Sequence, residues 1–197
     1  MNVIDSLGSP PLYLAVQRVD SDMVRLLLSY RLLDMNKKTQ DRFQFTALHE
    51  AVCKGRLLIV NLLLARGDAD INTRDSKGRT PLWWATKSDH PFIVKQLLAE
   101  DGLDINTAST GGSVLLHHAV NQGNRLIVSS LLAEDKLNPN VSNKAGITPL
   151  GCAAKNRDRD IVDLLLTQKD IKVNFGSLRL YLPFALAAAG RYYRVIL

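Results

Sequence analysis

The sequence contains few of the residues that catalytic, metal-binding and cross-linked proteins depend on. Two of its 197 residues are cysteine and four are histidine. No Cys/His cluster with metal-ligand spacing occurs, and neither a glycine-rich phosphate loop nor a nucleophile elbow is present. These absences argue against a zinc scaffold, a nucleotide-dependent enzyme and a serine hydrolase. We therefore expect no catalytic activity, no cofactor and no bound metal.

Long hydrophobic runs are also missing. The longest apolar stretch, residues 180–189, is interrupted by a proline and is too short to cross a bilayer, and the first residues lack a basic-then-apolar leader. We expect no membrane span and a location inside the cell, in the cytoplasm or the nucleus.

An internal repeat dominates what the sequence does contain. The segment DSKGRTPLWWA at residues 75–85 recurs in degenerate form, and the alanine that ends each copy recurs in steps of 36, 34, 34, 34 and 34 residues. Those alanines are Ala15, Ala51, Ala85, Ala119, Ala153 and Ala187. A second marker keeps the same register: Asn36, Asn72, Asn106, Asn140 and Asn174. A fixed period in this range indicates stacked structural repeats.

The motif at the centre of each copy identifies the kind of repeat. It reads TALHEA at residues 46–51, TPLWWA at 80–85 and TPLGCA at 148–153, with weaker copies at 10–15, 114–119 and 182–187. This pattern resembles the ankyrin repeat. The resemblance implies an all-α solenoid of paired antiparallel helices with finger-like β-turns. The longer unit endings, as in residues 98–106, are similar to those of arrays in fungal multidomain proteins.

The two markers set the repeat boundaries. Five full repeats (5–36, 37–72, 73–106, 107–140 and 141–174) and a partial sixth (175–197) are expected to form a single domain, 1–197. Cys53 and Cys152 then lie three repeats apart, too far for a disulfide, and free thiols fit a reducing compartment.

Local chemistry supports paired helices. Threonine is a good N-cap, proline is tolerated at the first helical position, and a small alanine allows two helices to approach. In the third repeat Phe92, Ile93, Leu97 and Leu98 are expected to share one buried stripe. The resemblance further implies that His49 and His117 hydrogen-bond neighbouring repeats together.

Two departures distinguish this chain. The turn that enters the second repeat is two residues longer than the next one, carries Phe43 and Phe45, and has Gln44 in place of a glycine. The left-handed position between paired helices is Gly55 in the second repeat but Val19 in the first. Because a β-branched residue is strained there, we expect an irregular first loop.

The resemblance also implies where a target would dock, since the finger turns and the exposed side of the first helices line a groove in such stacks. Eight basic residues and one acid, Glu50, occupy the groove positions. The basic residues are Arg18, Arg42, Lys54, Lys77, Arg79, Lys87, Lys144 and Lys155. Trp84, Phe43 and Phe45 add an aromatic cluster, and His118 also faces the groove.

We therefore expect a non-catalytic protein-interaction module, a scaffold, that binds an acidic or acidic–aromatic segment. A simpler interpretation is that the charges only solvate this face and that Trp84 packs beneath the long finger. A nucleic-acid or anionic-surface binder, and an architectural segment of a larger protein, remain as alternatives. Nucleic acid is less favoured, because the groove lacks aromatics repeated at nucleotide spacing. We expect a monomer that could associate through its C-terminal repeat.

Overall fold

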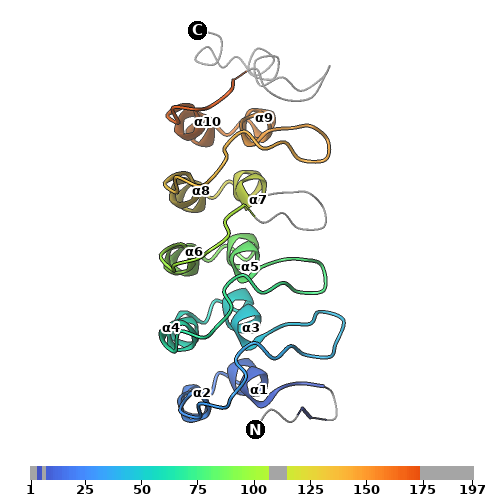
Figure 1. Cartoon of the computed structure of the whole chain (residues 1–197). Coiled ribbons are helices and arrows are strands. Elements are labelled where there is room, and N and C mark those ends of the chain that lie inside the picture. Colours follow the sequence, from blue (N-terminus) through green and yellow to red (C-terminus); the bar gives the residue numbers. More distant parts are fainter. Residues whose placement is uncertain (1–3, 6–7, 107–114, 174–197) are drawn as a thin grey trace. The chain divides into compact units, whose positions relative to one another are not determined.

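The computed structural model describes residues 4–5, 8–106 and 115–173 (Figure 1). The chain divides into two compact units, residues 1–104 and 105–197, and each is presented by itself below. The expected partial sixth repeat, 175–197, lies outside the described residues, and a single domain spanning both units stays a prediction. None of the helices in the described ranges is long and apolar enough to cross a membrane.

The described residues form ten helices and no strand. In the first unit these are α1 (Pro11–Gln17), α2 (Ser21–Leu28), α3 (Ala47–Cys53), α4 (Leu57–Ala65), α5 (Pro81–Lys87) and α6 (Pro91–Leu98). In the second they are α7 (Leu115–Gln122), α8 (Arg125–Leu132), α9 (Pro149–Asn156) and α10 (Arg159–Leu166).

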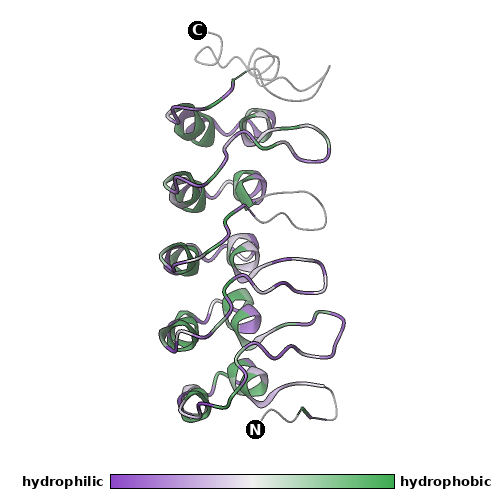
Figure 2. Cartoon of the chain, in the orientation of Figure 1, coloured by the Kyte–Doolittle hydropathy of each residue, from purple (hydrophilic) through white to green (hydrophobic). Residues whose placement is uncertain are grey.

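Each repeat is a helix pair, and within each unit neighbouring pairs pack on one another. Within the first unit α1, α3 and α5 form one row of contacts, and α2, α4 and α6 form the other. The same arrangement joins α7 to α9 and α8 to α10 in the second unit. Long turns project from the side of the first helices (Figure 1), and Figure 2 shows that these turns are mostly polar, whereas apolar residues concentrate on the helices.

The predicted helix starts are confirmed. The hydroxyl oxygens of Thr46, Thr80 and Thr148 each accept a hydrogen bond from the backbone N–H three residues later, which satisfies one otherwise unpaired donor. Pro81 and Pro149 occupy the first helical turn. In the first repeat Pro10 holds the cap position, and α1 therefore begins without a side-chain cap.

The core follows the repeat register. The marker alanines of the five described repeats are at most 5% exposed, because helices meet at these positions. Ile93 and Leu97 of α6 are buried as predicted. The prediction was wrong for Phe92, which is 74% exposed because it lies one residue, or about 100°, around the helix from Ile93.

The turn between paired helices keeps one geometry whatever residue stands in it. Val19, Asp89 and Arg157 adopt φ of 60°, close to the 69° of Gly55. The first loop is therefore regular, and Val19 carries the strain that the sequence predicts for a β-branched residue. At Gly55 a Cβ atom would lie 2.7 Å from the His90 ring, so a side chain there would require the ring to move.

The asparagine marker has a structural role. The Asn36 side chain donates to the Asp68 carbonyl (3.0 Å) and accepts from the Asp70 amide (2.7 Å), which joins the end of one repeat to the end of the next. Asn72 makes the same pair of contacts to Gly102 and Asp104, and in the second unit Asn140 reaches Asp170 and Lys172. This hydrogen bonding explains why the asparagine recurs with the period of the repeat.

The two motif histidines also join repeats, as predicted. His49 donates through Nε2 to the Arg79 carbonyl (3.1 Å), and His117 does so to the Ile147 carbonyl (2.8 Å). Burial lowers the pKa of His49 to about 4 and also lowers the pKa of His117. Both rings are therefore neutral structural donors at physiological pH.

Candidate functional site

The long finger of the second repeat is held by its own side chains. Asp41 Oδ1 accepts from the Thr39 hydroxyl and from the amides of Phe43 and Gln44, at 2.7 to 3.0 Å. Gln44 takes the glycine-like conformation, with φ of 54°. Across the base of the finger the Thr39 amide donates to the Phe45 carbonyl (2.8 Å). The turn is therefore ordered, and it fixes the two phenylalanine rings.

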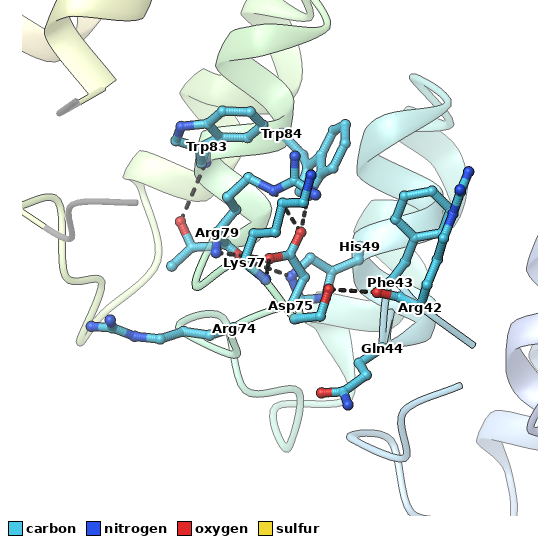
Figure 3. A network of polar contacts seen from close by, with 12 residues as sticks. Arg42, Phe43, Gln44, His49, Arg74, Asp75, Lys77, Arg79, Trp83 and Trp84 are labelled. Carbon is cyan, nitrogen blue, oxygen red and sulfur yellow. Dashed lines mark hydrogen bonds and ion pairs between the residues drawn. The ribbon is translucent and has the colours of Figure 1, made fainter. Parts of the chain in front are cut away.

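Asp75 organises the next finger. Its Oδ1 atom accepts from the amides of Lys77 (2.8 Å) and Arg79 (2.9 Å). Its Oδ2 atom accepts from Arg79 Nε (2.7 Å) and from the Trp84 indole N–H (3.1 Å), as Figure 3 shows. Burial raises the pKa of Asp75, but these four hydrogen bonds outweigh it and hold the pKa below its usual range.

Four aromatic rings form a continuous row from the long finger to helix α5, which we call the aromatic row. Its members are Phe43, Phe45, Trp84 and Trp83. Successive ring centroids lie 5.5, 5.2 and 5.2 Å apart, and the last two contacts are edge-to-face. Edge-to-face pairs at this distance contribute beyond their buried area. Phe45 also stacks on the His49 ring at 5.3 Å.

Cationic groups lie over these rings. The Arg79 guanidinium carbon is 4.3 Å from the Trp84 ring centre and 4.9 Å from that of Trp83, so it lies against both indoles. Lys87 Nζ is within 5.6 Å of both indole centres, and the Arg42 guanidinium is 4.6 Å from the Phe43 ring. Each such contact is worth about 0.5–2 kcal/mol, depending on how far it is desolvated.

The structure sorts the predicted site residues by depth. Those exposed in the first unit are Arg18, Arg42, Lys54, Lys77 and Lys87. Phe43 and Trp84 are half-buried, so each presents part of a ring to solvent. Phe45 and Arg79 are 6% and 8% exposed. These last two side chains support the aromatic row and offer little surface of their own.

The remaining predicted residues belong to the second unit. Lys144 and Lys155 are exposed there, and His118 is half-buried on α7. The first unit thus holds nine of the twelve predicted residues. It also contains the two fingers described above and the whole aromatic row.

The one acid predicted on this face is hidden. Glu50 is 6% exposed, and the Tyr13 hydroxyl from the first repeat donates to its Oε2 atom at 3.3 Å. Burial, reinforced by the charge of Glu50, raises the pKa of the Tyr13 phenol above its usual range. The exposed predicted residues of the first unit are therefore all basic or aromatic.

Sequence reasoning missed Asp75 as the residue that orients Trp84. Two signals were present: Asp75 lies four residues before Arg79, and two tryptophans follow within the same motif. For Trp84 the sequence predicts either a contact with a partner or packing beneath the long finger. The ring packs against Phe45 and the residue is half-buried, and its contact with a partner stays a prediction.

The described residues were also searched for candidate metal ligands. Across the described residues no group of three or more His, Cys, Asp or Glu side chains gathers in an arrangement that could hold a metal ion. Cys53 and Cys152 are free thiols.

Comparison with family models places the repeats. A model of ankyrin repeats in three copies matches residues 1–75 and 108–177, and a single ankyrin repeat model matches 77–109. The chain belongs to the ankyrin repeat family. Ankyrin repeats generally mediate protein–protein interactions, and such domains are typically not catalytic.

Similar proteins match different shares of this chain, from 38% to 96% of its residues. The ankyrin repeat domain of Bcl-3, described as a unique member of the IkappaB family, superposes with a TM-score of 0.83 at 26% identity, over 96% of this chain and 84% of that one. Potassium channel AKT1 of Oryza sativa subsp. indica is 37% identical over 87 residues, 43% of this chain and 9% of the channel. Alpha-latrocrustotoxin-Lt1a of Latrodectus tredecimguttatus is 32% identical over 75 residues, 38% of this chain. This alignment spans 5% of the toxin.

Proposed function

We propose that this ankyrin repeat protein is a non-catalytic interaction module and that its first unit binds an acidic protein segment with an aromatic or aliphatic anchor. The observation that carries the proposal is the half-exposed edge of the aromatic row, at Phe43 and Trp84, with exposed basic side chains on the same fingers and helices. Arg42 and Lys77 lie on the fingers, and Lys54 and Lys87 lie at the ends of α3 and α5.

The ordered fingers favour tight binding by this face. Trp84 is fixed by its indole N–H bond to Asp75 and by the Phe45 ring, so a partner would not have to immobilise it. A pre-oriented aromatic ring beside cations has the composition of an interaction hot spot. Truncation of such an anchor commonly costs at least about 2 kcal/mol, or roughly thirtyfold in affinity.

Charge would act on a different step of binding. Exposed lysines and arginines attract an acidic segment over a screening length of about 8 Å at physiological salt, so they act mainly on the association rate. We do not assign this role to Arg79, because its side chain is buried against both indoles and paired with Asp75. We propose a location inside the cell, where the thiols of Cys53 and Cys152 would stay reduced.

A displayed library of random peptides tests the proposal. Peptides are selected for binding to the wild-type protein. Peptides that also bind a variant carrying Trp84→Ala, Lys77→Glu and Lys87→Glu are then removed. We expect enriched peptides with net negative charge and at least one large apolar residue. For a selected peptide, Trp84→Ala should raise the dissociation rate roughly thirtyfold. Lys77→Glu with Lys87→Glu should lower the association rate severalfold and flatten its salt dependence.

Two outcomes would reject the proposal. If the selected peptides have no acidic bias, or if they bind the triple variant with unchanged affinity, the interface lies elsewhere. Single-stranded oligonucleotides that bind this face more tightly than every selected peptide would support the nucleic-acid alternative. A matched control is Lys95→Glu, which reverses an exposed charge on α6, away from the fingers.

A further inference from the structure

A cavity of about 370 Å³ lies between the loops that follow α8 and α10 in the second unit. Its volume is within the roughly 300–1,000 Å³ of sites that bind small molecules or single side chains. None of the carboxylates in its lining forms a hydrogen bond or ion pair with another residue that the structure describes. The lining includes three acids and three apolar residues: Glu134, Asp135, Asp170, Leu132, Leu137 and Pro139. Uncompensated carboxylates beside apolar walls suit a cation carried on an apolar stem.

The first unit contains a cleft built in the same way. Asn36 joins the loops that follow α2 and α4, and Asn140 joins the loops that follow α8 and α10, through the same two hydrogen bonds. Each residue beside the first cleft therefore has a defined counterpart beside the second. The counterparts are Arg31 and Asp135, Leu33 and Leu137, Arg66 and Gln168, and Asp68 and Asp170.

The Arg66 guanidinium occupies the first cleft. Its Nη2 atom donates to the Leu33 carbonyl (2.9 Å) and the Arg31 carbonyl (3.3 Å), and it pairs with Asp68 Oδ2 (3.1 Å). The Arg66 side chain is only 14% exposed. Two loop carbonyls and one carboxylate, arranged by the repeat itself, thus bind a largely buried guanidinium.

The second cleft keeps these acceptors and has no arginine of its own repeat. Asp170 stands in the position of Asp68, and the carbonyls of Asp135 and Leu137 accept no hydrogen bond from the described residues. Neutral Gln168 replaces Arg66. Lys169 also lines the cavity, but it forms no ion pair within the described part of the chain. The second cleft therefore offers the acceptors of a guanidinium site together with an excess of negative charge.

We propose that this cavity binds the guanidinium of an arginine side chain that belongs to a partner protein. The guanidinium would donate to the carbonyls of Asp135 and Leu137 and pair with Asp170, as Arg66 does in the first unit. Its methylene groups would lie along the apolar walls. Lysine fits less well, because an ammonium lacks the planar fork that reaches several acceptors at once. Free arginine would bring its own carboxylate close to the acids of the lining.

The cleft between the second and third repeats shows that the acceptor set is not common to all repeats. Gly102 stands there in the position of Asp68, and Glu100 stands in the position of Arg66 and accepts from Gln96 Nε2 (3.3 Å). Among the five described repeats only the second and the fifth have an aspartate at this position. One of the two has an internal arginine, and the other has the cavity.

This site shares no residue with the proposed peptide-binding face, and it selects the opposite charge. Failure of either proposal therefore leaves the other standing.

Nuclear magnetic resonance of the ¹⁵N-labelled full chain gives the first test, with arginine blocked at both ends as the probe. We expect saturable shifts of the amides of residues 132–138 and 167–170, with a dissociation constant on the order of 1 mM. Blocked lysine and blocked citrulline should bind at least about tenfold more weakly. Absence of saturable shifts at these amides, or equal binding of lysine, would overturn the proposal. Free arginine that binds more tightly than blocked arginine would indicate a small-molecule site and reject a protein partner.

Variants of the lining test the acceptors. Asp170→Asn combined with Glu134→Gln should weaken the binding of blocked arginine at least about tenfold. Asp101→Asn is the matched control, because Asp101 is the exposed counterpart of Asp135 in the third repeat and should not affect binding.

Gln168→Arg tests the likeness of the two clefts directly. The new side chain should occupy the cavity as Arg66 occupies the first cleft, so it should abolish binding of the probe and raise the midpoint of thermal unfolding. Circular dichroism verifies that each variant folds. Unchanged affinity for blocked arginine in a folded Gln168→Arg protein, or in the folded Asp170→Asn, Glu134→Gln protein, would refute the proposal.

Discussion

Replacement of Asp75 by asparagine would test whether this carboxylate holds the aromatic row. The second unit supplies a natural precedent for the backbone part of its role. Asn143 stands at the equivalent position and accepts from the amides of Ala145 (2.9 Å) and Ile147 (3.1 Å). These contacts match the ones that Asp75 Oδ1 makes to Lys77 and Arg79. Asparagine should therefore preserve the turn and remove only what Oδ2 does.

The loss at Oδ2 can be estimated from its surroundings. The Asp75 side chain is 0% and the Arg79 side chain 10% exposed, and their ion pair is 2.7 Å long. Breaking a buried pair costs about 3–5 kcal/mol, because a charge is left uncompensated. Contacts of Arg79 with two indoles offset part of this, while the unpaired Trp84 indole N–H adds to it. We expect Asp75→Asn to cost about 3 kcal/mol of unfolding free energy.

Urea unfolding of four proteins measures the coupling: wild type, Asp75→Asn, Arg79→Met and the double variant. Because Arg79→Met removes the buried charge, Asp75→Asn should cost much less in that background. At low pH the same interaction is lost in the wild type, since a lowered folded-state pKa contributes stability that disappears as pH falls through it. A cost below about 1 kcal/mol for Asp75→Asn, or strict additivity of the two changes, would refute the reasoning.

Three further outcomes are expected from the backbone and the buried rings. Because burial lowers the pKa of His49 from 6.5 to about 4, the unfolded chain binds the proton first, and stability should fall by about 3 kcal/mol between pH 6.5 and pH 4. Denaturant titrations across that range in wild type and His49→Gln measure it. Asp89→Gly should raise stability by about 0.5–1 kcal/mol, since φ is 60° there, whereas Ser88→Gly next to it should lower stability. Gly55→Ala should destabilise through its 2.7 Å approach to His90, and His90→Ala should recover part of the loss.

Each of these three predictions would be contradicted by a specific result. A flat stability profile between pH 6.5 and 4, or a profile that His49→Gln leaves unchanged, would mean that the ring is solvated in the folded state. An Asp89→Gly variant less stable than wild type would show that the aspartate side chain offsets its own strain. Gly55→Ala with unchanged stability would mean that the His90 ring moves away without cost.

The sequence predicts the fold well because two kinds of constraint recur with every repeat. Threonine caps such as Thr46, and the alanines where helices touch, satisfy local hydrogen bonds or steric limits that are the same in each copy. The asparagines also keep the register, because each binds the backbone of the following repeat. A fixed period therefore reports a fixed set of contacts, and the helix pairs follow from it.

The depth of individual site residues is a different matter. Phe45 and Arg79 occupy positions that the register assigns to the binding face, yet both are buried. Their burial arises from contacts particular to this chain, namely the longer finger, the adjacent tryptophans and the Asp75 carboxylate. A periodic pattern averages over repeats and cannot contain such contacts.

Comparison among repeats can recover information that a single repeat hides. Met23 alone is an ordinary half-exposed methionine, and surface hydrophobic residues are common. The other four repeats have isoleucines at the same position, all buried, so Met23 is the exposed member of a set of packing residues. The same comparison separates Asn143, which serves a turn alone, from Asp75, whose second oxygen also binds Arg79 and Trp84. In a repeat protein the departures from equivalence, read against the structure, are therefore the places where a partner or a special function should be sought.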